Sequence, residues 1–302
     1  ENLAPFKQSQ DFFFDHADVL TWAGLEKAAA WADRIYHMAA VVGMFKVLED
    51  PIKVLAINVA GCERVLRAAH SGNWSPQVVI ASSSEVYGTG VHCGRGLSCA
   101  GLAGRKVEAF REDMEPMVGS STVSRWNYSI SKLVDESFGL SYARSHKMRV
   151  VVIRFFNTVG PRQTGRYGMV IPRFVRKALA GEPLEVHGDG TQTRCFTHVS
   201  ESVRGVIGLM DLDSAVGEVF NIGSTEEIAI RRLAERVVEL TGSDSAIELV
   251  PYSQAYNDDF EDMQRRVPSI EKVRKAIGWR AEKSLDDILR SVIEYEKALA
   301  RN

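Results

Sequence analysis

The sequence predicts an α/β protein built around a doubly wound parallel sheet. Short runs rich in β-branched and aromatic residues alternate with longer segments whose apolar residues recur at helical spacing. This alternation is typical of units in which a helix connects two parallel strands. After residue 157, glycine and proline interrupt the pattern more often, as in "AGEPLEVHGDGTQTR". These irregular segments indicate a second, smaller lobe beside the sheet.

The individual elements follow from the same two periodicities. The expected strands are 11–15 ("DFFFD"), 33–40 ("DRIYHMAA"), 77–84 ("QVVIASSS") and 149–156 ("RVVVIRFF"). Between them, helical spacing predicts helices over 21–32, 50–70 and 126–145. The glycine-rich stretch between Gly88 and Trp126 is expected to be an inserted surface loop or lid.

Composition narrows the classes of function. The chain has 302 residues, 45% of them hydrophobic, and a formal net charge of -2. A net charge of this size gives no sign of the basic surface that binds nucleic acid or an anionic membrane, so small-molecule chemistry is expected. No apolar run approaches the roughly 18 residues of a membrane span, and the cytoplasm is the expected location. No metal site is expected, and four cysteines without metal-ligand spacing are expected to be free thiols: Cys62, Cys93, Cys99 and Cys195.

Tyr128 and Lys132 form the first candidate catalytic pair. They stand four residues apart in "RWNYSISK", within a segment of helical pattern, so both side chains lie on one helical face. A phenol has a pKa near 10, and a nearby ammonium group favours its ionised form. Tyr128 could then accept or donate a hydroxyl proton, while Lys132 also holds a ribose hydroxyl.

Ser83 and Glu85 lie at the end of an apolar strand, in "ASSSEVYG". The carboxyl end of a parallel strand is where open α/β sheets bind ligands, and Ser83 can donate to the oxygen that Tyr128 deprotonates. A carboxylate at the end of a buried strand is costly unless it is paired. Glu85 is therefore a further candidate functional residue.

The chain resembles the extended short-chain dehydrogenase/reductase family from about Phe12 onward, specifically the NAD-dependent nucleotide-sugar epimerases, dehydratases and decarboxylases. The matching blocks are "HADV" with Asp18 and Val19, "YHMAA" (36–40), "INVAG" with Asn58, "SSSEVYG" (82–88), "YSISK" (128–132), "RFFNTVGPRQ" (154–163), "LEVHGDGTQTRCFTHV" (184–199), "FNIGS" (220–224) and "RRVPSIEKVRKAIGW" (265–279). So many blocks in the family's order are not expected by chance.

The resemblance implies NAD as cofactor, a UDP-sugar as substrate, and a homodimer formed through the helices around 55–70 and 126–145. The implied catalytic residues are Ser83, Ser84, Glu85, Tyr128 and Lys132. The implied cofactor-binding residues are Asp18, Val19, Met38, Ala39, Ala40, Asn58, Ala81, Ser82, Tyr128, Lys132 and Thr158. The implied substrate-binding residues are Asn157, Arg173, His187, Gln192, Arg194 and Arg266.

The same resemblance implies a Rossmann-like cofactor domain and a substrate lobe. The cofactor domain is expected over 1–156 and about 194–222. The nucleotide-sugar lobe is expected over about 157–193 and 223–302. The glycine-rich turn that opens such cofactor domains and binds the pyrophosphate is not found near the start of the chain. This absence favours a non-catalytic relative as a minor alternative, although Ser83, Tyr128 and Lys132 are all present.

The pair Ser84 and Glu85 bears on which reaction the family resemblance implies. Pure 4-epimerases typically lack a glutamate at this position, whereas UDP-glucuronate decarboxylases carry Ser-Glu. In that reading both residues stand over C5 and C6 of the sugar, and Arg194 in "TQTRCF" approaches the sugar end. The favoured reaction is decarboxylation of UDP-glucuronate to UDP-xylose or its 4-keto intermediate. A UDP-sugar 4-epimerase and a 4,6-dehydratase remain the alternatives.

Overall fold

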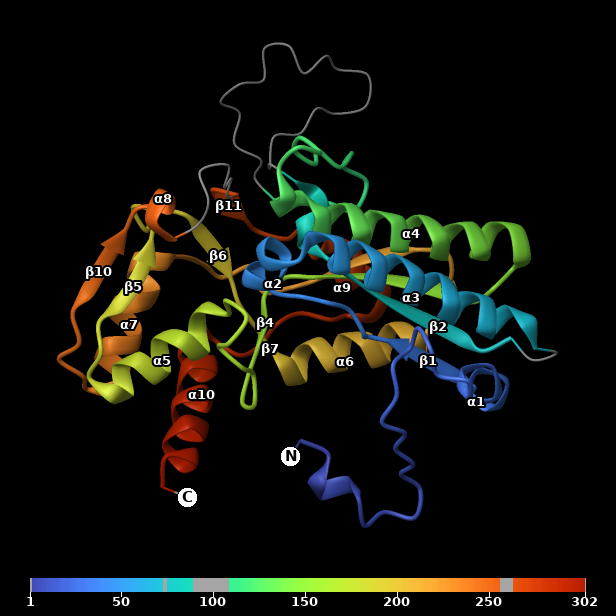
Figure 1. Cartoon of the computed structure of the whole chain (residues 1–302), viewed down its shortest axis with the longest axis horizontal. Helices are drawn as coiled ribbons and strands as arrows, with labels where there is room; N and C mark the ends of the chain where they lie inside the picture. Colours follow the sequence, from blue (N-terminus) through green and yellow to red (C-terminus); the bar gives the residue numbers. More distant parts are fainter. Residues whose placement is uncertain (1, 73–74, 89–108, 256–262, 302) are drawn as a thin grey trace.

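The computed structural model describes residues 2–72, 75–88, 109–255 and 263–301, and its central element is a four-stranded parallel sheet (Figure 1). The sheet has the order β1-β2-β3-β8, and each neighbouring pair is parallel. Its strands are β1 (Arg34–His37), β2 (Gln77–Ser83), β3 (Val150–Phe155) and β8 (Val219–Ile222). The predicted α/β fold class is confirmed, and three of the four predicted strands form.

Helices cover both faces of this sheet. The α-helices are α1 (Leu25–Trp31), α2 (Met44–Glu49), α3 (Pro51–Ser71), α4 (Asn127–His146), α5 (Val170–Ala180), α6 (Val199–Met210), α7 (Ile230–Thr241), α8 (Tyr252–Ala255), α9 (Glu271–Ile277) and α10 (Leu285–Leu299). Short 3-10 helices are η1 (Ala4–Phe6), η2 (Ser84–Tyr87), η3 (Ser124–Trp126) and η4 (Asp213–Ala215). Helices α3 and α4 lie on one face and α6 on the other (Figure 1).

Alternation of buried side chains along the strands explains why both faces need cover. On β2, Val78 and Ile80 belong to the apolar cluster under α3 and α4, whereas Val79 belongs to the cluster under α6. On β3, Val152 and Ile153 divide between the two clusters in the same way. The sequence of a strand that is buried on both faces is a continuous run of apolar residues, and both of these strands contain such a run.

A separate apolar cluster joins α5, α7 and α10 at the other end of the molecule (Figure 1). Small sheets lie beside it, with the orders β10-β5, β11-β6-β9 and β4-β7. Their strands are β4 (Thr158–Val159), β5 (Leu184–His187), β6 (Thr193–Cys195), β7 (Thr197–His198), β9 (Glu227–Ala229), β10 (Ile247–Val250) and β11 (Arg265–Arg266). The predicted division into two domains stays a prediction.

The prediction of a strand at residues 11–15 is wrong. The segment is a turn followed by irregular chain, and the side chains of Phe13 and Phe14 are 81% and 56% exposed. A strand is stabilised by hydrogen bonds to a neighbouring strand and by burial of one face. This aromatic run has neither in the described part of the chain.

The structure tests the expectations for the four cysteines and for the glycine-rich loop only in part. Cys62 and Cys195 are buried free thiols, as predicted. Cys93 and Cys99 lie outside the described residues, and so does most of the predicted glycine-rich loop.

A buried ion pair ties β3 to α4 directly behind the end of β2. The Arg154 guanidinium donates to both carboxylate oxygens of Glu136, at 2.8 and 2.7 Å. The hydroxyl of Ser82 donates to the same carboxylate at 2.5 Å. The side chains of Arg154 and Glu136 are 6% and 5% exposed. The hydrogen bond from Ser82 to Glu136 also links β2, the strand that carries Ser83, to α4, the helix that carries Tyr128.

We expect Arg154→Met to lower the free energy of unfolding by about 3–5 kcal/mol, because it leaves the Glu136 carboxylate buried without its counter-ion. Urea unfolding at pH 7 measures this. The control is Arg232→Met on α7, whose ion pair with Glu239 is exposed and should leave stability almost unchanged. Similar losses in both variants would contradict the assignment.

Candidate active site

A cavity of about 1010 Å³ lies at the carboxyl ends of β1, β2 and β3. Its lining comes from the main sheet, from α4 and α6, and from the segments around β5, β6 and β11. Ligands of open parallel sheets bind at this end of the strands. The volume accommodates more than one small molecule at once.

The candidate catalytic residues Ser83, Tyr128 and Lys132 meet at one wall of this cavity. Ser83 is the last residue of β2, and Tyr128 and Lys132 occupy the first turns of α4. The hydroxyl groups of Ser83 and Tyr128 are hydrogen-bonded to each other. The Lys132 ammonium donates to Asp135 Oδ2 at 3.0 Å, and both side chains are almost fully buried.

The electrostatic surroundings of Tyr128 work in opposite directions. Burial raises the pKa of Tyr128 above its usual value, while the charge of Lys132 and the hydrogen bond with Ser83 lower it. Burial is the largest of these effects. The Asp135 carboxylate is bound to the Lys132 ammonium, so its negative charge offsets part of the effect of Lys132 on the pKa of Tyr128.

Glu85 lies between two arginines that come from distant parts of the chain. Its carboxylate is 2.7 Å from Arg125 Nη1 through Oε2, and 2.7 Å from Arg266 Nη1 through Oε1. Burial alone would raise the pKa of Glu85, but the charges of Arg125, Arg266 and Arg194 outweigh it and lower the pKa to about 2. The carboxylate is therefore ionised at neutral pH.

Arg194 and Asn157 continue the polar wall toward the second lobe. Arg194 Nη1 donates to the carbonyl oxygens of Thr193 and Met263, each at 2.7 Å, and these two bonds hold the guanidinium group in place. Asn157 has a φ of 33°, and its Nδ2 donates to the Cys195 carbonyl at 2.8 Å. The left-handed backbone at Asn157 turns the chain between β3 and β4 beneath the cavity.

A second polar group lines the far end of the cavity. Arg173 Nη1 lies 3.3 Å from His187 Nε2, and Gln192 Nε2 donates to the His187 carbonyl at 2.8 Å. A carbonyl can only accept, so this bond fixes which end of the Gln192 carboxamide is nitrogen. Its Oε1 is buried with no hydrogen-bond partner among the described residues.

The cavity residues fit the nicotinamide end of NAD, the cofactor that the family resemblance implies. The predicted cofactor residues that line the cavity are Met38, Ala40, Ala81, Ser82, Tyr128, Lys132 and Thr158. Opposite them, Val199 and Val203 of α6 are 39% and 48% exposed, and Tyr36 of β1 is 42% exposed. These exposed apolar side chains all face the cavity and would be covered by a flat aromatic ring.

Four predicted cofactor residues lie outside the cavity lining. Asp18 accepts a hydrogen bond from the Leu20 amide, and the Val19 carbonyl accepts one from Arg64 of α3. Asn58 uses its carboxamide within the protein, bonding the Val41 amide at 2.7 Å and the Ser131 hydroxyl at 3.1 Å. The fourth residue outside the lining is Ala39.

All the predicted catalytic and substrate residues line the cavity. The catalytic ones are Ser83, Ser84, Glu85, Tyr128 and Lys132, and the substrate ones are Asn157, Arg173, His187, Gln192, Arg194 and Arg266. Arg125 and Tyr252 are among the lining residues that were not predicted from the sequence. A signal existed for Arg125, which stands three residues before Tyr128 and so one helical turn away. Tyr252 packs on Gly188, where a Cβ would lie 2.6 Å from its ring, and no motif marks it.

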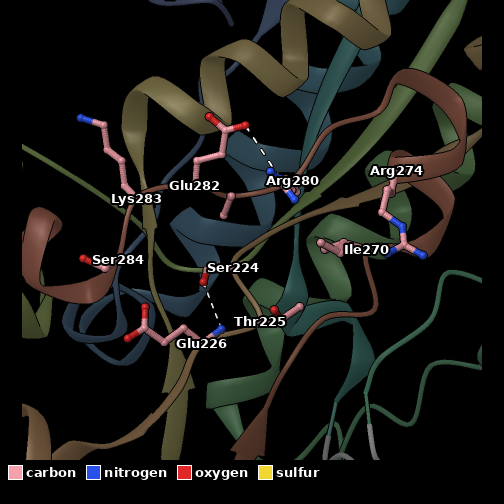
Figure 2. Close-up of a pocket in the computed structure, with 10 residues that line it drawn as sticks. Ser224, Thr225, Glu226, Ile270, Arg274, Arg280, Glu282, Lys283 and Ser284 are labelled. Carbon is pink, nitrogen blue, oxygen red and sulfur yellow. Dashed lines mark hydrogen bonds and ion pairs between the residues drawn. The ribbon is translucent and has the colours of Figure 1, made fainter.

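A smaller cavity of about 330 Å³ shares no lining residue with the large one (Figure 2). Its wall mixes both charge signs, including Arg274, Arg280, Glu226 and Glu282. The Glu226 carboxylate accepts from the Leu285 amide at 2.9 Å, at the first residue of α10. This junction stabilises the start of α10.

Comparison with known proteins gives consistent results. The model of the NAD dependent epimerase/dehydratase family matches residues 2–223. A UDP-N-acetyl-alpha-D-glucosaminuronate decarboxylase from Bacillus cytotoxicus is 36% identical over 87% of this chain and 76% of its own. UDP-glucuronic acid decarboxylase 1 of Danio rerio is 32% identical over 87% of this chain, which spans only 57% of that relative.

Solved structures agree on the fold. A UDP-glucuronic acid 4-epimerase from Bacillus cereus, solved with UDP-glucuronic acid and NAD, has a TM-score of 0.83 at 24% identity. The match covers 99% of this chain and 85% of the epimerase. MoeE5, solved with UDP-glucuronic acid and NAD, has a TM-score of 0.78 at 26% identity over 94% of this chain and 85% of its own. Among the described residues, no helix is both long and apolar enough to cross a membrane.

Proposed function

Because the chain belongs to the NAD dependent epimerase/dehydratase family, we propose that it decarboxylates a UDP-linked uronic acid. The first candidate substrate is UDP-glucuronate, and the product is UDP-xylose or its 4-ketone. The resemblance to the nucleotide-sugar epimerases, dehydratases and decarboxylases is confirmed by the family match, and the family is NAD-dependent. The choice of reaction within the family is the proposal.

The arginine cluster around Glu85 carries this proposal. Three guanidinium groups, those of Arg125, Arg194 and Arg266, lower the pKa of this one carboxylate. Guanidinium groups in the cavity wall suit a sugar that carries its own carboxylate better than a neutral hexose, because they bind carboxylates through charge-assisted hydrogen bonds. A uronic acid brings that carboxylate at C6, next to the carbon that is protonated after carbon dioxide leaves.

The roles of the residues at C4 follow from their contacts. Bound NAD supplies the reversible oxidation of the sugar at C4. Tyr128 accepts the proton of the C4 hydroxyl, and the hydrogen bond from Ser83 orients the phenol for it. Lys132 favours the ionised phenol and donates to a ribose hydroxyl, while Asp135 fixes the direction of the lysine side chain.

The roles at C5 and C6 fall to Glu85, Ser84 and the arginines. A ketone at C4 makes the C6 carboxylate that of a β-keto acid, so the C5–C6 bond breaks with release of carbon dioxide and its electron pair forms an enolate. C5 then takes a proton. With a pKa of about 2, Glu85 is an acceptor and a fixed negative charge, so it orients Arg266 and the sugar. Ser84 follows Ser83 directly and is only 1% exposed, and its hydroxyl can donate a hydrogen bond to the sugar at C5 and C6.

A second candidate substrate is UDP-N-acetylglucosaminuronate. The UDP-N-acetyl-alpha-D-glucosaminuronate decarboxylase of Bacillus cytotoxicus is 36% identical to this chain, against 32% for the UDP-glucuronic acid decarboxylase of Danio rerio. The two substrates differ at C2 alone, and the C4 and C6 chemistry is shared. The same residues therefore serve either substrate.

The experiment is incubation of the full chain with NAD and either UDP-uronate, followed by mass spectrometry and NMR of the products. We expect loss of carbon dioxide, seen as a mass decrease of about 44 for UDP-xylose, or about 46 where the 4-ketone is released. A product of unchanged mass with inverted C4 would instead establish the 4-epimerase. Turnover of a neutral UDP- or dTDP-hexose with loss of water would establish the 4,6-dehydratase, and no binding of NAD or UDP would favour the non-catalytic alternative.

The proposal includes two features implied by the resemblance, a homodimer and a cytoplasmic location. Helices α3 and α4 pack side by side on one face of the sheet and are the expected interface (Figure 1). Light scattering of the purified chain measures the mass in solution. A monomer mass at micromolar concentration would contradict the dimer.

A further inference from the structure

Arg125 is a buried arginine that neither the catalytic motif nor the substrate blocks include. It lies in η3, and its side chain is 1% exposed. Its guanidinium stacks 4.3 Å from the ring centroid of Trp126 and donates from Nη1 to Glu85 Oε2 at 2.7 Å. The stacking on Trp126 and the hydrogen bond to Glu85 together restrain the plane and the direction of the guanidinium.

We propose that Arg125 is a positioning residue for the decarboxylation half of the reaction, holding Glu85 and, through Glu85, Arg266 at the sugar end of the cavity. The inference rests on the proposed function and assigns Arg125 a task within it. Arg125 lies in η3, which leads directly into α4, and it stands three residues before Tyr128. Adjacent helical segments therefore carry the base for C4 and the anchor for the group at C5 and C6. The two halves of the site therefore share one rigid support.

The geometry of Glu85 explains why an anchor is needed. Its two oxygens are used by different arginines, Oε2 by Arg125 and Oε1 by Arg266. Arg266 lies on the two-residue strand β11, which pairs with β6 at Arg194. Among the described residues, the charged and titratable groups that act on Glu85 include these three arginines and Tyr128. Without Arg125, the carboxylate can rotate toward the other two arginines, and Arg266 loses its fixed counter-ion.

The decisive variants are Arg125→Met, which removes the charge, and Arg125→Lys, which keeps it. Single-turnover absorbance at 340 nm follows C4 oxidation, and release of carbon dioxide follows the second half. In Arg125→Met we expect carbon dioxide release to fall about 100-fold and C4 oxidation to change less than about threefold, since a misplacement near 1 Å has effects of this size. The acidic limb of the pH profile should move to higher pH, because Glu85 loses the charge that lowers its pKa.

Arg125→Lys should release carbon dioxide about tenfold faster than Arg125→Met, because it keeps the positive charge. The control is Arg290→Met, at an exposed arginine of α10, which should behave as wild type. Equal loss of both half-reactions, or an acidic limb that does not move, would overturn the positioning role. If Arg125→Met does not fold, Arg125→Lys decides: a selective loss of decarboxylation supports the role, and an equal loss refutes it.

A readout independent of turnover separates this inference from the proposed function. Carbon-13 NMR of the labelled Glu85 carboxyl should show its titration at higher pH in Arg125→Met than in wild type. If wild type releases no carbon dioxide from either UDP-uronate, the proposed function fails. A moved Glu85 titration would then still support Arg125 as its anchor, and an unmoved one would refute that as well.

Discussion

Replacement of Tyr128 by phenylalanine is expected to lower the rate of C4 oxidation by about 10³-fold. The phenol is the only titratable group in hydrogen-bond contact with Ser83 among the described residues, and phenylalanine keeps its shape while removing the proton acceptor. Single-turnover absorbance at 340 nm with UDP-glucuronate measures the step. Tyr295→Phe on α10 is the matched control and should leave the rate unchanged. A Tyr128→Phe variant within tenfold of wild type would show that another group takes the proton.

The pH dependence gives a second test of the same residue. Burial raises the pKa of Tyr128, and Lys132 opposes that effect. Removal of the ammonium in Lys132→Met therefore raises the pKa of Tyr128 further. Since the ionised phenol is the base, the pH of half-maximal C4 oxidation should move upward in this variant. A midpoint that stays in place would mean that Asp135 already cancels the effect of Lys132.

Three of the four strands of the main sheet and the meeting of the candidate pair Tyr128 and Lys132 were predictable, because short periodic patterns specify them. A strand such as 77–84 is continuously apolar, and Tyr128 and Lys132 meet because helix geometry joins residues four apart. Ser83 was predictable from the rule that ligands bind at the carboxyl ends of parallel strands. These inferences need no knowledge of distant contacts.

The partners of the charged residues were not predictable in the same way. Glu85 and Arg266 are 181 residues apart in sequence, yet they are 2.7 Å apart in space. The sequence shows an isolated carboxylate, and only the fold supplies the arginines that keep it ionised. Phe13 and Phe14 illustrate the converse, because an aromatic run with strand character remains exposed when no neighbouring strand pairs with it.

Glu85→Gln is expected to slow release of carbon dioxide by about 10²- to 10³-fold while C4 oxidation changes less than about fivefold. Glutamine keeps the shape of the side chain but removes the charge that Arg125 and Arg266 share. Rapid-quench measurement of both half-reactions tests this, with Glu271→Gln on α9 as the exposed control. Equal activity in Glu85→Gln and wild type would mean that the carboxylate is purely structural and would remove the main support for decarboxylation over epimerisation.

The same carboxylate makes stability depend on pH in a defined direction. The folded pKa of Glu85 is about 2, against 4.5 for the free side chain, so its stabilising effect is fully present above pH 4.5 and is lost as the pH falls through 2. A shift of this size corresponds to about 3 kcal/mol. The difference in unfolding free energy between wild type and Glu85→Gln should therefore shrink as urea titrations move from pH 7 to pH 3. A difference that stays constant over this range would show that folding does not lower the pKa of Glu85, and the strong coupling of its carboxylate to Arg125 and Arg266 would fail with it.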